Sequence, residues 1–176
     1  AVAEAAVSSG LRGFDHACLA QLYQVHLWLT LECPDGPAST DALLSDPLFR
    51  ERCRKAMQSD VHVSQLQQSV GRQLIHLQSG IEEEFVEPRT GYSLDFALPA
   101  SRLAVEVDGP SHFMRGNRGE HVPNGATLLK QRLLKAAGWR VVTIPYYEWH
   151  SIASDVHAQR EYLERNIRAA CAGALL

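Results

Sequence analysis

The chain has 176 residues and a mass of 19.5 kDa, which suffices for one compact domain with an extension. Hydrophobic residues make up 45% and charged residues 21% of it, so a disordered, collagen-like or coiled-coil chain is excluded. The formal net charge of −3 excludes a polybasic, histone-like binder. The sequence contains no run of 18 apolar residues, so neither a membrane-spanning helix nor a membrane partner is predicted.

The first 80 residues are predicted to form a helical extension. Apolar residues recur at helical spacing over residues 15–32, and the Cys-Pro-Asp-Gly-Pro segment at 33–37 ends that helix. Pro47 is expected near the first position of a second helix. A third helix is expected over about residues 59–79, and Gly80 ends it. Such helices are typical of packing faces, so this half is expected to be packing material or the end of a longer helical array.

Residues 81–176 are predicted to form a second domain with a mixed sheet. Segment 82–87 fits an edge strand, and segments 92–98 and 103–108 alternate between apolar and polar residues, which predicts a hairpin. A polar loop is expected over 111–125, followed by a helix over 126–137, a buried strand over 139–144 and a last helix over 154–172. Strand, helix and strand at this spacing predict a βαβ crossover. The expected fold class is therefore α/β: a small mixed sheet, made of a hairpin plus a βαβ crossover, flanked by helices.

Three carboxylates are expected to share one face of the hairpin. A two-residue loop at 100–101 places Asp95 opposite Glu106, and a loop at 101–102 places it opposite Asp108. An odd-length loop or a bulge would break this arrangement. Because like charges opposite each other destabilise a sheet, the cluster predicts a hard cation, Mg²⁺ or Mn²⁺, bound by all three. In the alternative, Asp95 accepts backbone hydrogen bonds, Glu106 pairs with an arginine, and Asp108 makes an Asp-Gly turn.

The segment that follows the hairpin is basic. Residues 112–140 contain six Lys or Arg residues and one acid, which gives a local formal charge of +5. Cations beside an acidic face suit phosphodiester chemistry, and aromatic side chains can stack on bases. The residues that we expect to contact a nucleic acid are Phe113, Arg115, Arg118, Arg132 and Trp149. The alternatives are a solvated loop with a charged helix face, and a Trp149 that packs in the core. The four cysteines form no CxxC pair, so neither a zinc site nor a disulfide framework is predicted.

Three runs of sequence resemble the RAP domain. They are LDFALP at 94–99, LAVEVDGPSHF at 103–113 and TLLKQRLLKAAGWRVVTIPYYEW at 127–149, and the motif core covers residues 92–149. The resemblance implies an RNA-processing protein of a chloroplast or mitochondrion, with helical repeats upstream in the same full-length protein and no small-molecule cofactor. It also implies a restriction-endonuclease-like core, similar to the PD-(D/E)XK and very-short-patch-repair endonucleases.

The resemblance further implies roles for single residues. Asp95 takes the place of the hairpin aspartate of those nucleases, and Glu106 takes the place of their second acid. Asp108 occupies the position where many of them have a lysine that prepares the attacking water. That role would then fall to Lys130, from the crossover helix, or to His112 as a general base. Two functions stay open: a metal-dependent endoribonuclease, or an RNA-binding or protein-interaction module that kept the nuclease fold without catalysis.

Overall fold

The computed structural model describes residues 14–33, 44–58 and 63–172. The chain divides into two compact units, Ala1–Ser59 and Asp60–Leu176. This boundary places the third predicted helix in the same unit as the sheet, whereas the sequence pattern suggested a boundary at residue 80. The predicted helix breaker at 34–37 and the start of the third helix at 59–62 lie outside the described residues. None of the described helices is long and apolar enough to cross a membrane.

The first unit contains two described helices, α2 (His16–Glu32) and α4 (Pro47–Lys55), which contact each other. Asp15 caps α2, because its carboxylate accepts a 2.7 Å hydrogen bond from the backbone N–H of Cys18. Pro47 occupies the first turn of α4, as its fixed φ and missing N–H favour. Buried side chains at i, i+4 and i+8 form the inner stripe of α2: Leu19, Tyr23 and Leu27.

The second unit is built on a four-stranded mixed sheet with strand order β1-β2-β3-β6. The first three strands are antiparallel, and β6 runs parallel to β3 after the crossover helix α6. The predicted edge strand, hairpin and βαβ crossover are therefore confirmed. The bounds of these elements are β1 (Glu82–Val86), β2 (Ser93–Leu98), β3 (Leu103–Asp108), α6 (Gly125–Ala136) and β6 (Arg140–Pro145).

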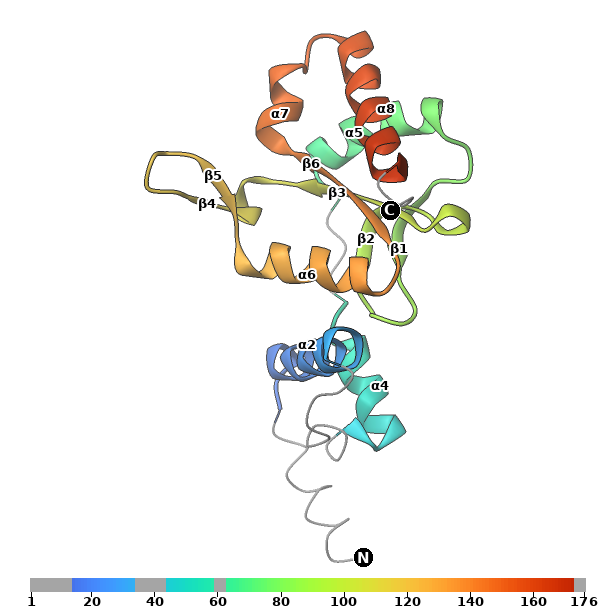
Figure 1. Cartoon of the computed structure of the whole chain (residues 1–176), viewed down its shortest axis with the longest axis vertical. Helices are drawn as coiled ribbons and strands as arrows, with labels where there is room; N and C mark the ends of the chain where they lie inside the picture. Colours follow the sequence, from blue (N-terminus) through green and yellow to red (C-terminus); the bar gives the residue numbers. More distant parts are fainter. Residues whose placement is uncertain (1–13, 34–43, 59–62, 173–176) are drawn as a thin grey trace, which may run out of the picture. The chain divides into compact units, whose positions relative to one another are not determined.

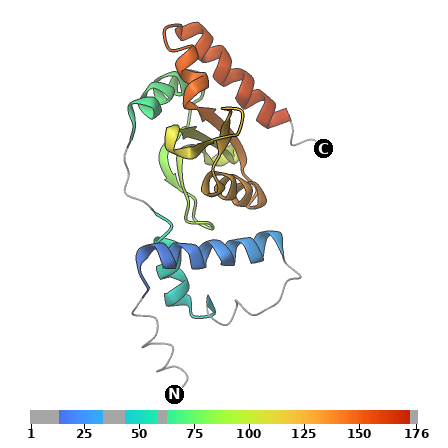
Figure 2. The same ribbon diagram turned by 90° about the vertical axis from the view of Figure 1, so that its left-hand side faces the viewer.

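Helices cover both faces of this sheet (Figures 1 and 2). Helix α6 lies on one face, while α5 (Gln65–Leu77) and α8 (Val156–Ala172) lie on the other. The main core lies between the sheet on one side and helices α5 and α8 on the other. Helix α5 lies close to the sheet at Gly71, where a Cβ atom would be only 2.9 Å from the ring of Phe96. The fully or largely buried members of this core include Val70, Leu74, Phe96, Val105, Ile144 and Leu163.

Two elements differ from the sequence prediction. The polar loop predicted at 111–125 contains a two-stranded antiparallel ribbon, β4 (Phe113–Arg115) and β5 (His121–Pro123). Its strands have only three residues each, too few for hydrophobic alternation to show. A short helix, α7 (Tyr146–Ser151), also follows β6 without a loop.

The ribbon is closed at its neck by backbone and side-chain hydrogen bonds. The backbone N–H of Asn124 donates to the carbonyl of His112 at 2.8 Å, and its side-chain amide donates to the carbonyl of Ser111 at 2.9 Å. The same Asn124 side chain accepts from the N–H of Thr127 at 2.9 Å and so caps α6. The neck therefore fixes where the ribbon leaves the domain and where α6 begins.

Candidate functional site

The hairpin register decides where the acidic side chains lie. Phe96 pairs with Val105 and Leu98 pairs with Leu103, a register that places Asp95 opposite Glu106 when it is continued by one residue. The connection has four residues, with a 3₁₀ turn at Pro99–Ser101 and Arg102 in the left-handed region, where two were predicted. The four-residue connection 99–102 is centred on the same point as a two-residue loop at 100–101, so the first of the two predicted registers, with Asp95 opposite Glu106, is the one that forms.

Asp95 leaves the regular strand pairing. In the register of β1 and β2, Asp95 would pair with Glu84. The pairs on either side, Glu83–Phe96 and Phe85–Leu94, form, but this one does not, and Glu84 has a φ of 50°. The carboxylate of Asp95 instead accepts a 2.6 Å hydrogen bond from the backbone N–H of Val107. Asp95 therefore fills the backbone-accepting role that the sequence analysis held as the alternative to metal binding.

Glu106 lies buried on β3 beneath the crossover helix. Lys130 of α6 reaches it, and its Nζ lies 2.5 Å from Oε2 of Glu106. Burial raises the pKa of Glu106 to about 7, although the positive charge of Lys130 acts in the opposite direction. The second oxygen, Oε1, is buried and has no hydrogen-bond partner. Lys130 thus supplies the counter-charge that the alternative to metal binding assigned to an arginine.

Asp108 ends β3 and faces a histidine. Its Oδ1 lies 3.0 Å from Nδ1 of His112, and its buried Oδ2 has no hydrogen-bond partner. The hydrogen bond to Asp108 raises the pKa of His112, and partial burial of the ring opposes that rise. The hydroxyl of Thr127 lies 3.2 Å from the same Nδ1. Because Nδ1 is engaged in this way, Nε2 is the atom with which His112 could give or take a proton.

The structure therefore brings all five predicted catalytic residues into one acid–base cluster: Asp95, Glu106, Asp108, His112 and Lys130. Carboxylate oxygens are the ligands that Mg²⁺ and Mn²⁺ prefer, and two of them lack a hydrogen-bond donor. As the side chains lie, however, no three His, Cys, Asp or Glu residues in the described part of the chain are arranged to hold a metal ion. Lys130 and the N–H of Val107 occupy oxygens that such a site would need.

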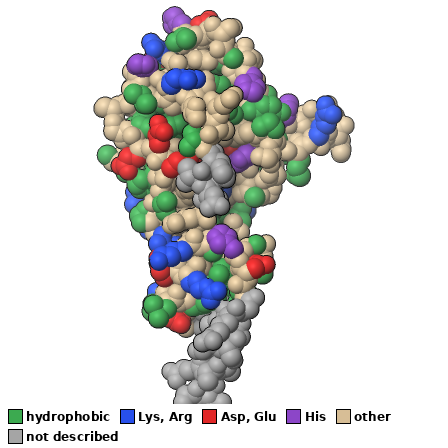
Figure 3. All heavy atoms as spheres, turned by 180° about the vertical axis from the view of Figure 1, so that it is seen from behind, with side chains coloured by type: hydrophobic (Ala, Val, Ile, Leu, Met, Phe, Trp, Pro, Cys, Tyr) green, Lys and Arg blue, Asp and Glu red, His purple; other side chains and the backbone are tan. Residues whose placement is uncertain are grey.

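The residues predicted to contact RNA lie in different surroundings. Arg115 and Arg118 are exposed on the β4–β5 ribbon, and Figure 3 shows Lys or Arg atoms near the tip of the arm that this ribbon forms. Arg132 is exposed on α6, and Phe113 is half-buried at the base of the ribbon. Trp149 is only 1% exposed, and its indole N–H donates to the hydroxyl of Ser69 at 3.1 Å. Trp149 therefore packs in the core, which was the alternative assignment.

Phe113 belongs to an aromatic cluster at the base of the ribbon, in which the part of His121 was missed from the sequence. His121 of β5 stacks on Tyr147 of α7, with ring centroids 4.2 Å apart and an interplanar angle of 16°. The hydroxyl of Tyr146 lies 2.9 Å from Nε2 of His121, and the ring of Phe113 meets His121 and Tyr147 edge-on. The consecutive tyrosines directly after a buried strand were the available signal, but the β5 partner depends on a ribbon that the sequence did not predict.

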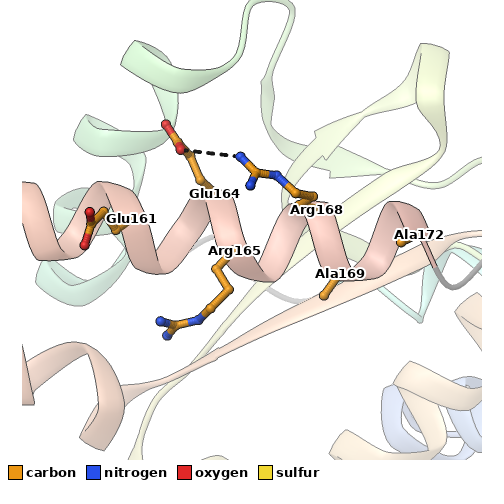
Figure 4. A pocket seen from close by; sticks show the side chains of 6 residues that line it. All are labelled: Glu161, Glu164, Arg165, Arg168, Ala169 and Ala172. Atoms are coloured by element: carbon orange, nitrogen blue, oxygen red, sulfur yellow. Dashed lines mark ion pairs between the residues drawn. The ribbon is translucent and has the colours of Figure 1, made fainter.

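A shallow pocket elsewhere on the unit contains none of the predicted site residues. It lies along α8, where acidic and basic side chains alternate and Glu164 pairs with Arg168 at 3.9 Å (Figure 4). This pattern is typical of a solvated helix face. The residues that line the pocket are Glu161, Glu164, Arg165, Arg168, Ala169 and Ala172.

Comparison with known proteins gives a consistent result. The family model of the RAP domain matches residues 105–166, from the middle of β3 into α8. A chloroplastic RAP domain-containing protein of Oryza sativa subsp. japonica is 33% identical over 151 residues, which are 86% of this chain and 22% of that protein. The mitochondrial FAST kinase domain-containing protein 3 of Rattus norvegicus is 28% identical, over 87% of this chain and 25% of that protein. The chain thus spans about a quarter of the length of these relatives.

Proposed function

The chain contains a RAP domain, and on this premise we propose that its second unit is an RNA-binding domain of an organellar RNA-processing factor. Relatives named as chloroplastic and mitochondrial proteins support the organellar location. Because the chain spans only about a quarter of these relatives, we propose that helical repeats elsewhere in the full-length protein select the RNA sequence.

One observation carries the RNA-binding proposal: the two exposed arginines on the β4–β5 ribbon. Arg115 and Arg118 project with the ribbon beyond the main sheet, and they lie at the start of the segment with a local charge of +5. Guanidinium groups bind phosphate oxygens in a fixed, two-pronged geometry, so the arm suits a nucleic-acid backbone. The remaining residues of the chain carry a net negative charge, which repels the phosphates of RNA and so favours binding at the arm.

The test is the salt dependence of RNA binding by fluorescence anisotropy. A labelled single-stranded RNA is titrated with the whole chain at salt concentrations between about 50 and 200 mM. In a plot of the logarithm of the binding constant against the logarithm of the salt concentration, each lost phosphate contact makes the slope shallower by about 0.7. We expect Arg115→Ala and Arg118→Ala each to weaken binding and flatten the slope. Arg168→Ala, which removes the same charge from α8, is the matched control and should change neither. Equal slopes for all four proteins would contradict the proposal.

A second candidate function is cleavage of RNA with Mg²⁺ or Mn²⁺. The observation that favours it is the pair of buried carboxylate oxygens without hydrogen-bond donors, Oε1 of Glu106 and Oδ2 of Asp108. Such oxygens are costly to bury, and a cation would satisfy them. Binding would require Lys130 to release its oxygen of Glu106, because the side chains as they lie form no metal site among the described residues.

End-labelled RNA, incubated with either metal or with EDTA, tests this second function. If the chain is a nuclease, cleavage should need the metal and disappear in both Glu106→Gln and Asp95→Asn. Arg168→Ala again serves as the control variant with intact activity. Cleavage that persists in EDTA or in both variants would contradict this second function, as would the absence of cleavage by the unaltered chain. RNA binding would then be the one function that remains proposed.

A further inference from the structure

We propose that His121 and Arg115 form a subsite for one nucleotide of single-stranded RNA. In this subsite the base stacks on the outer face of the His121 ring, and Arg115 holds the adjacent phosphate. The inference rests on the proposed RNA-binding function and names the part of the surface that receives a base.

The ring of His121 is held as a rigid platform. One of its faces stacks on Tyr147 at 4.2 Å, and Nε2 shares a 2.9 Å hydrogen bond with the hydroxyl of Tyr146. Phe113 meets the ring edge-on at 6.1 Å and 88°. His121 is nevertheless exposed. The ring face that points away from Tyr147 is the one on which we place the base. A base that stacks there would extend an existing aromatic stack, with little loss of side-chain freedom.

The ribbon register places a positive charge beside this platform. Arg115 and His121 are direct partners in the β4–β5 pairing, so their side chains leave the same face of the ribbon. Directly paired residues have Cβ atoms about 5 Å apart, a separation that a flexible arginine easily spans around one nucleotide. Met114 and Val122 form the neighbouring pair on the side of the neck and therefore lie on the opposite face. One face of the ribbon thus combines a ring and a guanidinium, and the other does not.

The location of this face connects it with the acid–base cluster. Phe113, which contacts both His121 and Tyr147, directly follows His112 in the chain. A nucleotide held on His121 would therefore lie next to the residues that surround Asp108. Stacking platforms accept any base, because each base has a flat aromatic face. We accordingly expect a site for single-stranded RNA with little base preference.

The experiment uses RNA oligomers that carry the fluorescent base 2-aminopurine at successive positions, bound to the whole chain. Stacking quenches 2-aminopurine, so one position should darken on binding. His121→Ala should restore that emission and weaken binding by about 5- to 100-fold, the range for one stacked base. His121→Phe keeps a flat ring and should largely restore both signals. Met114→Ala, on the opposite ribbon face, is the matched control and should behave as the unaltered chain.

A second arm separates stacking from phosphate binding. An oligomer with an abasic site at the quenched position should bind the unaltered chain and His121→Ala equally well, while Arg115→Ala should still weaken its binding. If His121→Ala keeps full affinity and quenching while Arg115→Ala loses salt-dependent binding, the nucleotide subsite is wrong and the RNA-binding function stands. If the unaltered chain binds no RNA at any salt concentration, both are wrong.

Discussion

Glu106→Gln should change how the stability of the second unit depends on pH. Burial raises the pKa of this carboxyl from an ordinary 4.5 to about 7. Between these values the folded chain binds a proton that the unfolded chain has released, so the free energy of unfolding of the unaltered chain falls as the pH rises. At about 1.4 kcal/mol for each pH unit, the loss between pH 4.5 and 8 is about 3 kcal/mol. The glutamine cannot ionise, so the variant should not suffer this loss.

Two other groups of the cluster, His112 and Asp95, act in the same direction but are present in both proteins. The raised pKa of His112 provides stability that is complete below its ordinary value of 6.5 and is lost as the pH rises through the higher folded value. The raised pKa of Asp95, caused mainly by burial, also lowers stability as that group ionises. The difference between the unaltered chain and Glu106→Gln therefore isolates the contribution of Glu106.

The assay is urea unfolding at closely spaced pH values between about 4.5 and 8, with EDTA present. Tryptophan fluorescence reports on the second unit once Trp28 of the first unit is replaced by phenylalanine, since Trp139 and Trp149 both belong to the sheet unit. Glu161→Gln, an exposed carboxylate on α8, is the matched control and should give a profile parallel to that of the unaltered chain. Parallel profiles for Glu106→Gln as well would refute the reasoning.

Three further changes test the packing around the site. Gly71→Ala should lower the free energy of unfolding by about 1–3 kcal/mol, because the added Cβ would lie 2.9 Å from the ring of Phe96. An unchanged midpoint of urea unfolding would contradict that contact. Lys130→Met should lower the unfolding free energy more at pH 8 than at pH 5, by up to about 3–5 kcal/mol, because without the positive charge the pKa of Glu106 rises further and the buried carboxyl must bind a proton or stay charged without a partner; an equal cost at both values would argue against the ion pair. Asn124→Ala should lower the unfolding free energy by about 1 kcal/mol through the lost cap of α6, and thermal melts that superimpose would show that the cap contributes nothing.

The hairpin and its acids were predictable because their causes are local. Alternation of apolar and polar residues defines both strands, and any even-length connection keeps the three acids on one face of the hairpin. Which acid lies opposite Asp95 depends on where the connection is centred, and that choice between two registers was left open by the sequence. The position of Lys130 on the crossover helix followed from the βαβ order for the same reason. In such elements, residues close in sequence carry enough information to fix which side chains meet.

The details that escaped prediction depend on distant partners or on very short elements. Asp95 turns to the backbone of Val107 where Glu84 interrupts the pairing of β1 with a positive φ, and nothing in the sequence around residue 84 indicates that conformation. Trp149 was a candidate for the surface because it follows the last strand. Its burial depends on α7 and on Ser69, a hydrogen-bond partner 80 residues earlier in the chain. Tertiary contacts of this kind leave no local pattern.

The closed neck of the β4–β5 ribbon separates the length of the arm from the packing of the domain. Since Asn124 joins the two ends of the ribbon at His112 and also starts α6, residues inserted at the turn 116–119 would lengthen the arm without shifting the cluster around Glu106. Lengthening a flexible turn is inexpensive, at about 0.6 kcal/mol for each doubling of the loop. The length and charge of the arm can therefore change without altering the packing of the buried centre.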